Sequence, residues 1–289
     1  MAEPQWAIEA RGLRKEFGAK VAVAGADLTV PPGEVFGFLG PNGAGKTTTG
    51  RMLTGQSRPH GGQAVLLGLD VVRHREEVQA QIGVCFEVTN LYEQMSALEN
   101  LRLFGRLYGV RDLDAEGLLE RVGLGGRGRE RAAGYSKGMK QRLMVARALV
   151  HRPRILFLDE PTEGLDPVSA EAIRNLILEE RARGATIFLT THDMLEADRL
   201  CDRVAFISHG EIAALDTPHA LKQRYGQRLV EAEVQGAGGL LERREIPMDG
   251  PEAAEALRAL FAGEQVVTIH SREASLEDIF IQVTGRGLA

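Results

Sequence analysis

The most informative segment of the sequence is Gly40-Pro41-Asn42-Gly43-Ala44-Gly45-Lys46-Thr47, which Thr48 follows. It matches the pattern G-x-x-x-x-G-K-[ST] in full. Apolar residues 35–39 precede it and predict a buried strand, and the pattern from Lys46 to Leu53 predicts a helix. Glycines let the backbone curl so that N–H groups point at phosphate oxygens, and the helix N-terminus attracts anions. The stretch therefore predicts a phosphate-binding loop of an α/β fold.

Side-chain chemistry assigns a role to the lysine and the two threonines at the end of this loop. Lys46 is expected to reach the β- and γ-phosphates, Thr47 to offer its hydroxyl to Mg²⁺, and Thr48 to face the α-phosphate. A second apolar run, residues 155–158, ends in Asp159 and Glu160. A parallel strand delivers such carboxylates to the sheet edge where ligands bind. We expect Asp159 to hold Mg²⁺ through water, and Glu160 to orient or deprotonate an attacking water.

Length and composition agree with a cytoplasmic globular protein. The 289 residues are 44% hydrophobic and 26% charged, which permits one large and one small domain. The net charge of −5 argues against a nucleic-acid partner. The only cysteines, Cys85 and Cys201, are far apart, which fits a reducing compartment. No apolar run is long enough to span a membrane, and the N-terminus lacks the features of a signal peptide.

Periodicity organises the chain into a large first part and a small second part. Residues 6–38 read as short strands, residues 187–189 as a buried strand and residues 168–183 as a helix. Residues 88–150 are mostly helix-forming. After Tyr225 the composition changes. Several glycines are followed by segments that predict a helix, a strand and a last helix. We place a domain boundary near residue 220, with a small α+β domain over 221–289.

A rival interpretation comes from Gly134-Tyr135-Ser136-Lys137-Gly138, which matches the G-x-S-x-G nucleophile elbow of serine hydrolases. Asp166 and His192 even follow in Ser, Asp, His order. The elbow requires a strand directly before the serine. Residues 127–133 are charged and interrupted by glycine, so we do not expect a strand there. The sequence therefore disfavours a hydrolase of this class.

The same segment, extended to Arg142, lies 17 residues before Asp159 at the predicted start of a helix. In this position it resembles the signature of ATP-binding-cassette (ABC) ATPases, usually Leu-Ser-Gly-Gly-Gln. Residues 159–167 resemble the Walker B and D-loop run of that family, and His192 resembles its switch histidine. Phe17 lies 23 residues before Gly40, as the family's adenine-stacking aromatic does. The resemblance covers about residues 6–220.

The resemblance implies a P-loop ABC-ATPase core over 1–220, with an N-terminal antiparallel β layer and a helical insert at about 88–150. It implies an ATPase that uses ATP and Mg²⁺ and powers a transporter, with export suggested by a tail that resembles ABC-2 subunits. The alternative is a soluble ABC ATPase of assembly or repair. The implied partners are a polytopic membrane-spanning permease and a second ATPase subunit, in a homodimer, at the inner face of the cell membrane.

In such a dimer one subunit would supply the phosphate loop and the catalytic groups, and the other would supply Ser136 and Gly138 against the γ-phosphate. The implied catalytic residues are Glu160, His192 and Lys46. The implied nucleotide-binding residues are Phe17, Gly40, Pro41, Asn42, Gly43, Ala44, Gly45, Lys46, Thr47, Thr48, Ser136 and Gly138. The implied metal-binding residues are Thr47, Glu87 and Asp159.

Several positions depart from the family pattern. The signature has Lys137 in place of its first glycine and Met139 in place of its final glutamine. Glu87 stands where the family usually has a glutamine that touches Mg²⁺, and Glu163 stands in place of the usual Asn or Ser of the D-loop. A carboxylate can bind Mg²⁺ but adds negative charge beside the γ-phosphate. We therefore expect Glu87 either to alter metal dependence or slow turnover, or to be a tolerated substitute.

Overall fold

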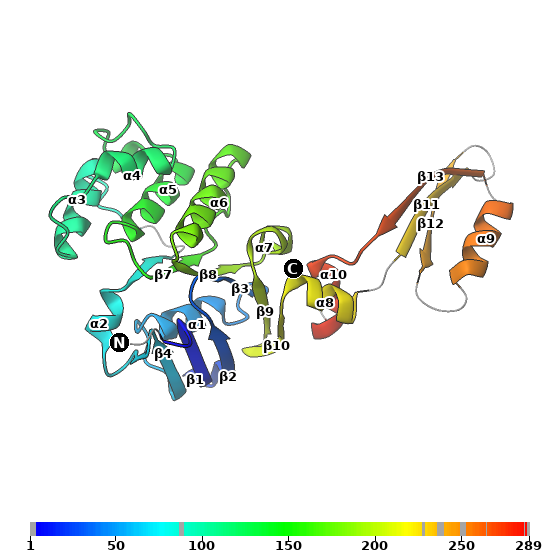
Figure 1. Ribbon diagram of the computed structural model, residues 1–289, viewed down its shortest axis with the longest axis horizontal. Coiled ribbons are helices and arrows are strands. Elements are labelled where there is room, and N and C mark those ends of the chain that lie inside the picture. Colours follow the sequence, from blue (N-terminus) through cyan, green and yellow to red (C-terminus); the bar gives the residue numbers. More distant parts are fainter. Residues whose placement is uncertain are drawn as a thin grey trace. The chain divides into compact units, whose positions relative to one another are not determined.

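The structure is a computed structural model that describes residues 4–86, 90–226, 229–235, 240–248, 253–263, 265–285 and 287 (Figure 1). The chain divides into two compact units, Met1–Leu215 and Asp216–Leu288. The first unit holds two sheets and most of the helices, and the second holds one small sheet. None of the helices in the described ranges is long and apolar enough to cross a membrane.

The first sheet is the antiparallel layer that the sequence predicts. Its order is β2-β1-β4-β5, and β1 pairs with both β2 and β4 in antiparallel register. Along β1, Ile8, Ala10 and Leu13 are buried while the end of the strand at Phe17 is exposed. The strands are β1 (Ile8–Phe17), β2 (Lys20–Val30), β4 (Gly61–Leu66) and β5 (Leu69–Asp70).

The second sheet carries the parallel core. Its order is β10-β9-β3-β8-β7-β6, and β3 pairs in parallel with β8 and β9, as β7 does with β8 and β6. Every residue of β3, β7 and β8 is buried, as expected for parallel strands covered on both faces. The strands are β3 (Val35–Leu39), β6 (Ile82–Cys85), β7 (Ile155–Asp159), β8 (Thr186–Thr191), β9 (Arg203–Ser208) and β10 (Glu211–Asp216).

One hydrophobic core joins the two sheets. Helix α1 (Lys46–Leu53) contributes Met52 and Leu53 to a cluster that includes Ile8 of β1 and Phe36 of β3. The ring of Phe188 lies 5.7 Å from that of Phe36 and 5.4 Å from that of Phe157, so aromatic contacts tie the central strands together. Because β3, β7 and β8 are parallel, their carboxyl ends meet at one edge of the sheet.

Residues 90–150 form the predicted helical region, with α3 (Ala97–Leu107), α4 (Ala115–Arg121), a short 3₁₀ turn η1 (Ala132–Gly134) and α5 (Lys137–Ala148). Helices α3, α4 and α5 contact one another, and α5 also contacts α6 (Figure 1). Ser96 caps α3, Asp114 caps α4 and Ser136 caps α5. The remaining helices of the unit are α2 (Arg75–Gln79), α6 (Pro167–Ala182) and α7 (Met194–Leu200).

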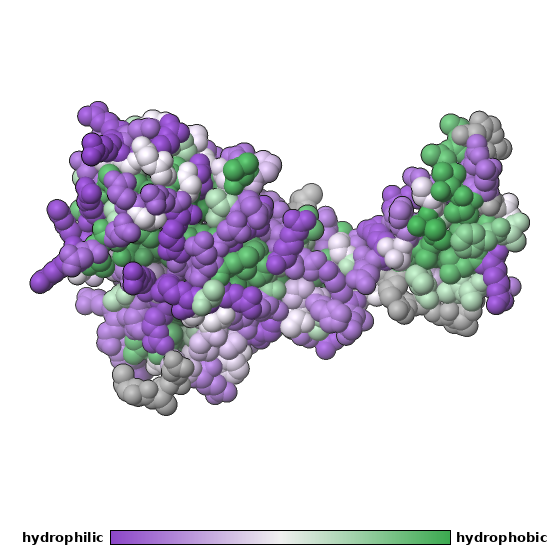
Figure 2. All heavy atoms as spheres, turned by 45° about the horizontal axis from the view of Figure 1, so that its top comes forward, coloured by the Kyte–Doolittle hydropathy of each residue, from purple (hydrophilic) through white to green (hydrophobic). Residues whose placement is uncertain are grey.

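The second unit is a small α+β arrangement, as the sequence predicts. Its sheet has the order β12-β11-β13, and its core includes Val230, Ala232, Ile246 and Leu260. Apolar side chains also gather on its surface, among them Phe261, which is 61% exposed (Figure 2). The elements are α8 (Pro218–Tyr225), β11 (Leu229–Gln235), β12 (Leu241–Pro247), α9 (Ala253–Gly263), β13 (Gln265–Arg272) and α10 (Leu276–Thr284).

Candidate functional site

The predicted phosphate-binding loop lies between β3 and α1. Gly45 precedes α1 with a φ of 116°, a conformation that side chains rarely adopt. A Cβ on Gly40 would lie 2.3 Å from the carbonyl oxygen of Ile207, and one on Gly45 would lie 2.6 Å from that of Ala22. The Lys46 ammonium curls back and donates to the carbonyl oxygen of Gly40 at 2.6 Å. The carbonyl oxygens of Ile207 and Ala22 leave no room for a Cβ atom at positions 40 and 45, so both positions require glycine.

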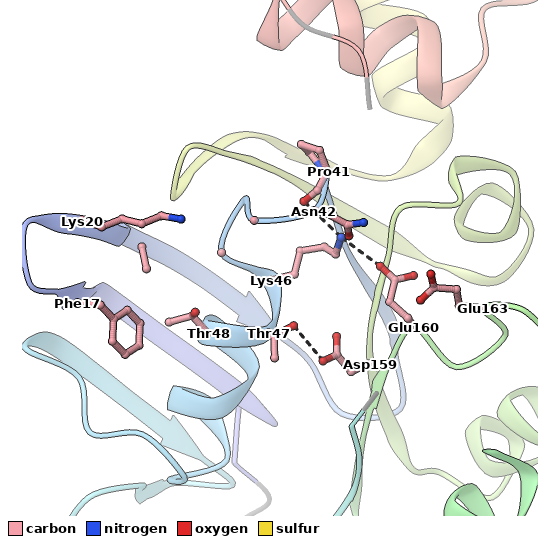
Figure 3. A pocket seen from close by; sticks show the side chains of 13 residues that line it. Phe17, Lys20, Pro41, Asn42, Lys46, Thr47, Thr48, Asp159, Glu160 and Glu163 are labelled. Carbon is pink, nitrogen blue, oxygen red and sulfur yellow. Dashed lines mark hydrogen bonds and ion pairs between the residues drawn. The ribbon is translucent and has the colours of Figure 1, made fainter. Parts of the chain in front are cut away.

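The loop forms one wall of a pocket of about 400 Å³. Figure 3 shows Lys46 and Glu160 pointing toward each other, with Phe17 and Lys20 on the side of the pocket away from Glu163. The size and the mixed polar and aromatic lining suit a small phosphorylated ligand. The lining residues are Phe17, Lys20, Ala22, Pro41, Asn42, Gly43, Gly45, Lys46, Thr47, Thr48, Asp159, Glu160 and Glu163.

Two threonine hydroxyls hold the carboxylate of Asp159 at the end of β7. The residue is 3% exposed, so its charge is almost removed from bulk water. Thr47 Oγ1 donates to Asp159 Oδ2 at 3.0 Å, and Thr190 Oγ1 of β8 donates to Asp159 Oδ1. Burial of a charge is costly unless hydrogen bonds compensate it. The two threonines therefore fix where this carboxylate points.

Glu160 lies between a lysine and a histidine. Its carboxylate Oε1 is 3.1 Å from Lys46 Nζ, and its Oε2 is 3.0 Å from Nδ1 of His192, which follows β8. Lys46 is 6% exposed and Glu160 is 8% exposed. Neither Glu160 Oε1 nor His192 Nδ1 has a partner with hydrogen-bond geometry among the described residues. Glu160 Oε1 can therefore accept a hydrogen bond from a water that enters the pocket.

The backbone at Glu160 is unusual. Its φ is 48°, in the left-handed region that a residue with a side chain adopts at a cost. Its N–H donates to the carbonyl oxygen of Thr190 at 2.9 Å, which holds the turn against β8. This turn directs the carboxylate of Glu160 toward Lys46 and His192.

Phe17 and Thr48 line the same pocket, as predicted. Three residues that were not predicted to bind nucleotide, Lys20, Ala22 and Glu163, line it as well. Phe17 is 58% exposed, so its ring is available for stacking. Lys20 and Ala22 line the pocket beside it, and Phe17 pairs with Lys20 at the turn between β1 and β2. Recognition of that turn would have placed Lys20 near Phe17. Glu163, noted only as a departure from the family pattern, also lines the pocket.

Ser136 and Gly138 do not line this pocket. Ser136 is the N-cap of α5, and its hydroxyl accepts a hydrogen bond from the Met139 N–H at 3.3 Å. A Cβ on Gly138 would lie 3.3 Å from Leu165, so the start of α5 packs closely on the loop after Glu160. A 3₁₀ turn, not a strand, precedes Ser136, as expected against the hydrolase interpretation. The structure thus separates the two predicted halves of the site within one chain.

The side-chain oxygens of Thr47 and Asp159 suit a hard cation such as Mg²⁺. In proteins this ion binds one or two carboxylates and leaves its other positions to phosphate and water. The described ranges contain no cluster of three or more His, Cys, Asp or Glu residues that could hold a metal by itself. Glu87, the third predicted metal ligand, lies outside the described residues. Burial raises the pKa of the nearby Cys85 thiol to about 12, which excludes a reactive thiolate there at neutral pH.

Comparison with known proteins identifies the family. A family model described as ABC transporter matches residues 23–163. The chain is 48% identical to a fluoroquinolones export ATP-binding protein of Mycobacterium tuberculosis over 97% of this chain and 94% of the relative. It is 38% identical to the Nod factor export ATP-binding protein I of a Rhizobium species, over 97% of both chains. A daunorubicin resistance ATP-binding protein of Streptomyces coeruleorubidus is also 38% identical, over 97% of this chain and 95% of the relative.

Solved structures support the same family. A structure described as the ATP-binding subunit of an ABC transporter matches with a TM-score of 0.70 and 31% identity, over 75% of this chain and 92% of that chain. A dimeric ATP-binding cassette bound to ADP and Pi shares the fold, with a TM-score of 0.67 and 24% identity, over 73% of this chain and 98% of the other. The relatives do not favour the alternative of a soluble ATPase of assembly or repair. The chain belongs to the ABC transporter family, as an ATP-binding and ATP-hydrolysing subunit of the exporter type.

Proposed function

We propose that two copies of this chain close around two ATP molecules, and that hydrolysis drives export through a polytopic membrane-spanning partner. The observation that carries the proposal is the division of the site. The phosphate loop, Asp159 and Glu160 line one pocket, and His192 contacts Glu160, whereas Ser136 and Gly138 do not line that pocket. A second copy would supply the missing half. The helix N-terminus at Ser136 is suited to face a γ-phosphate, because its dipole favours anions.

The buried charges suggest a role for each residue around the phosphates. Lys46 would exchange its bond to the Gly40 carbonyl for the β- and γ-phosphate oxygens. Glu160 would accept a proton from the attacking water as the bond between the γ-phosphorus and its bridging oxygen breaks, with ADP and phosphate as products. His192 would orient Glu160 or the γ-phosphate. Phe17 would stack on the adenine ring.

The metal site that we propose rests on Thr47 and Asp159. Their side-chain oxygens are 3.0 Å apart and face the pocket, which suits a cation shared with phosphate oxygens. When bound, Mg²⁺ would neutralise charge on the phosphates. We retain Glu87 as a proposed third ligand because of its position in the sequence.

The relatives support a location and a first cargo to test. Their names describe export ATP-binding proteins, and the chain covers nearly their whole length. We infer a cytoplasmic protein bound to the inner face of the cell membrane through its permease. The name of the Mycobacterium tuberculosis relative makes fluoroquinolones the first compounds to test. We keep 1–220 as the ATPase domain and 221–289 as an accessory domain, supported by the division at Leu215 and Asp216.

Mixing two inactive variants tests the shared site. Lys46→Ala disrupts the half-site that contains the phosphate loop. Ser136→Ala disrupts the half-site that the second copy would supply. A mixed dimer would contain one intact site. Activity should recover to at most about a quarter of the wild-type value, because half of random pairs are mixed and each has one working site.

The control mixture combines Lys46→Ala with Glu160→Gln. Both changes fall on the same side, so every site in every pair would be broken and no activity should return. If the first mixture remains as inactive as the control, each chain holds a complete site and the proposal is wrong. Purification from detergent-solubilised membranes should also recover a polytopic partner with two copies of this chain.

A further inference from the structure

A further buried carboxylate, that of Glu196, lies near Glu160 and His192. Glu196 lies on α7, four residues after His192, and is 3% exposed. It is not among the residues that line the pocket. Glutamate is rarely buried to this degree without a partner. Its contacts therefore indicate which segments this residue holds together.

Glu196 joins the segment after Glu160 to the segment after His192. Thr162 Oγ1 donates to Glu196 Oε2 at 2.6 Å, which ties down the loop two residues beyond Glu160. The Glu196 N–H donates to Asp193 Oδ1 at 3.0 Å, so the first turn of α7 is held beside His192. The same residue thus contacts both chain segments that carry Glu160 and His192.

A third element meets the same carboxylate. Nη1 of Arg174 on α6 lies 3.8 Å from Glu196 Oε1, and this oxygen has no hydrogen bond among the described residues. Arg174 also pairs with the exposed Glu171 at 3.0 Å. Burial raises the pKa of Glu196, as do the nearby acids Asp193 and Glu160, while Thr162 and Arg174 lower it. The carboxylate is therefore held mainly through its short hydrogen bond from Thr162.

This arrangement matters because the turn at Glu160 is strained. A backbone with a φ of 48° persists only where surrounding contacts hold it. The Thr190 carbonyl holds the turn at the Glu160 N–H, and Thr162 is the next residue with a buried partner outside the turn. Release of Thr162 would remove the contact that holds the segment after Glu160, and would leave the Thr190 carbonyl and the His192 N–H, which donates to Glu160 Oε2 at 3.3 Å, to hold the turn.

We propose that Glu196 is a positioning residue for ATP hydrolysis, which acts through Thr162 to hold Glu160 at 3.0 Å from His192. The inference rests on the roles proposed above for Glu160 and His192. Glu196 touches neither substrate nor metal in this arrangement. Its loss should slow the chemical step and leave nucleotide binding nearly unchanged, because the phosphate loop and Asp159 do not contact it.

The test compares four variants of the full chain in ATP hydrolysis and in equilibrium binding of ADP. Glu196→Ala removes the acceptor for Thr162, and Thr162→Val removes the donor while keeping the shape of the side chain. Each should lower kcat by about tenfold or more, since small misplacement of a catalytic group is costly. Glu196→Gln keeps an acceptor oxygen and should restore most of kcat. Glu171→Ala is the matched control and should change kcat by less than about twofold, because its pair with Arg174 is on the surface.

The double variant separates positioning from a general loss of stability. If Glu196 acts through Thr162, combining Glu196→Ala with Thr162→Val should lower kcat no further than the worse single change. Unchanged kcat in Glu196→Ala and Thr162→Val, or effects that multiply in the double variant, would overturn the inference. Should Glu196→Ala not fold, Thr162→Val and Glu196→Gln still decide it.

Glu160→Gln keeps this result distinct from the fate of the proposed function. If Glu160→Gln hydrolyses ATP at the wild-type rate, the role of Glu160 itself is wrong. If Glu160→Gln is inactive but Thr162→Val and Glu196→Ala keep the wild-type kcat, only the positioning role of Glu196 is wrong.

Discussion

At the scale of single residues, Asp159 shows what a buried carboxylate needs. It receives hydrogen bonds from Thr47 in the phosphate loop and Thr190 on the neighbouring strand, and it is almost fully buried. Thr47 already belongs to the proposed site, whereas Thr190 lies on β8 and is not among the residues that line the pocket. The second bond can be removed without touching a proposed ligand.

Thr190→Val removes that second bond and should weaken metal binding. We expect the Mg²⁺ concentration for half-maximal ATPase activity to rise about tenfold, because partners behind a metal ligand orient it. Thr186→Val is the control, since Thr186 lies at the other end of β8 and accepts a hydrogen bond from the Gly33 N–H. Both variants should lose about 1–3 kcal/mol in the free energy of unfolding. An equal Mg²⁺ dependence in the two would contradict the role of Thr190.

Two glycines of the phosphate loop should respond differently to alanine. At Gly45 a Cβ would lie 2.6 Å from a carbonyl oxygen, whereas at Gly43 it would meet nothing within 4 Å. Gly43→Ala should cost only the left-handed conformation, about 1–2 kcal/mol. Gly45→Ala should cost clearly more and abolish ATP binding, as measured by denaturant unfolding and by nucleotide titration. Equal losses in the two would show that the contact with Ala22 is not what limits position 45.

At the scale of elements, the N-terminus of α5 combines a structural and a proposed functional role. Ser136 caps α5 with φ −63° and ψ 165°, and Ser96 caps α3 with nearly the same geometry, φ −67° and ψ 165°. Both hydroxyls accept from the backbone N–H three residues later. Both serines thus cap a helix through the same bond, although Ser96 also forms a capping box with Glu99. Of the two, only Ser136 belongs to the proposed ATP site.

Replacement of either serine by alanine should therefore cost about 1 kcal/mol of stability, the usual effect of losing an N-cap. Only Ser136→Ala should also reduce ATP-dependent dimer formation, followed by light scattering in a Glu160→Gln background that retains ATP. Ser96→Ala is the matched control. If both variants dimerise equally well, the hydroxyl of Ser136 does not contact ATP across the dimer.

At the scale of the whole molecule, every described residue of the pocket lies in the unit Met1–Leu215. The second unit has its own core around Val230 and Ile246. Each unit therefore has its own core, and the described residues that line the pocket all come from the first unit. Nucleotide binding should therefore be a property of the first unit.

A chain that ends at Asp216 tests this independence. Its affinity for ADP should agree with that of the full chain within about 0.5 kcal/mol, measured by calorimetry. The complete chain, under the same conditions, provides the reference. Loss of binding in a truncated chain that is still folded by circular dichroism would show that the second unit supports the site.

Local chemistry made much of the fold and the candidate site predictable. The glycine-rich stretch before Lys46 and the apolar run before Asp159 each specify a strand, a turn and a ligand-facing group within a few residues. The fold prediction that follows from them is confirmed by the related structures. The structure also brings Lys46, Thr47, Asp159, Glu160 and His192 together, because their parallel strands end at one edge of the sheet.

The residues that hold these groups in place could not be predicted, because they come from segments that meet only in the folded chain. Thr190 and Asp159 are 31 residues apart in the chain, and Thr162 and Glu196 are 34 apart. Neither pair has a spacing pattern, since each forms when strands or loops that are distant in sequence pack side by side. The left-handed turn at Glu160 is equally invisible in the sequence. Local patterns were enough to predict which residues would form the proposed site, whereas packing set the orientation of their side chains, because orientation depends on contacts that no local pattern encodes.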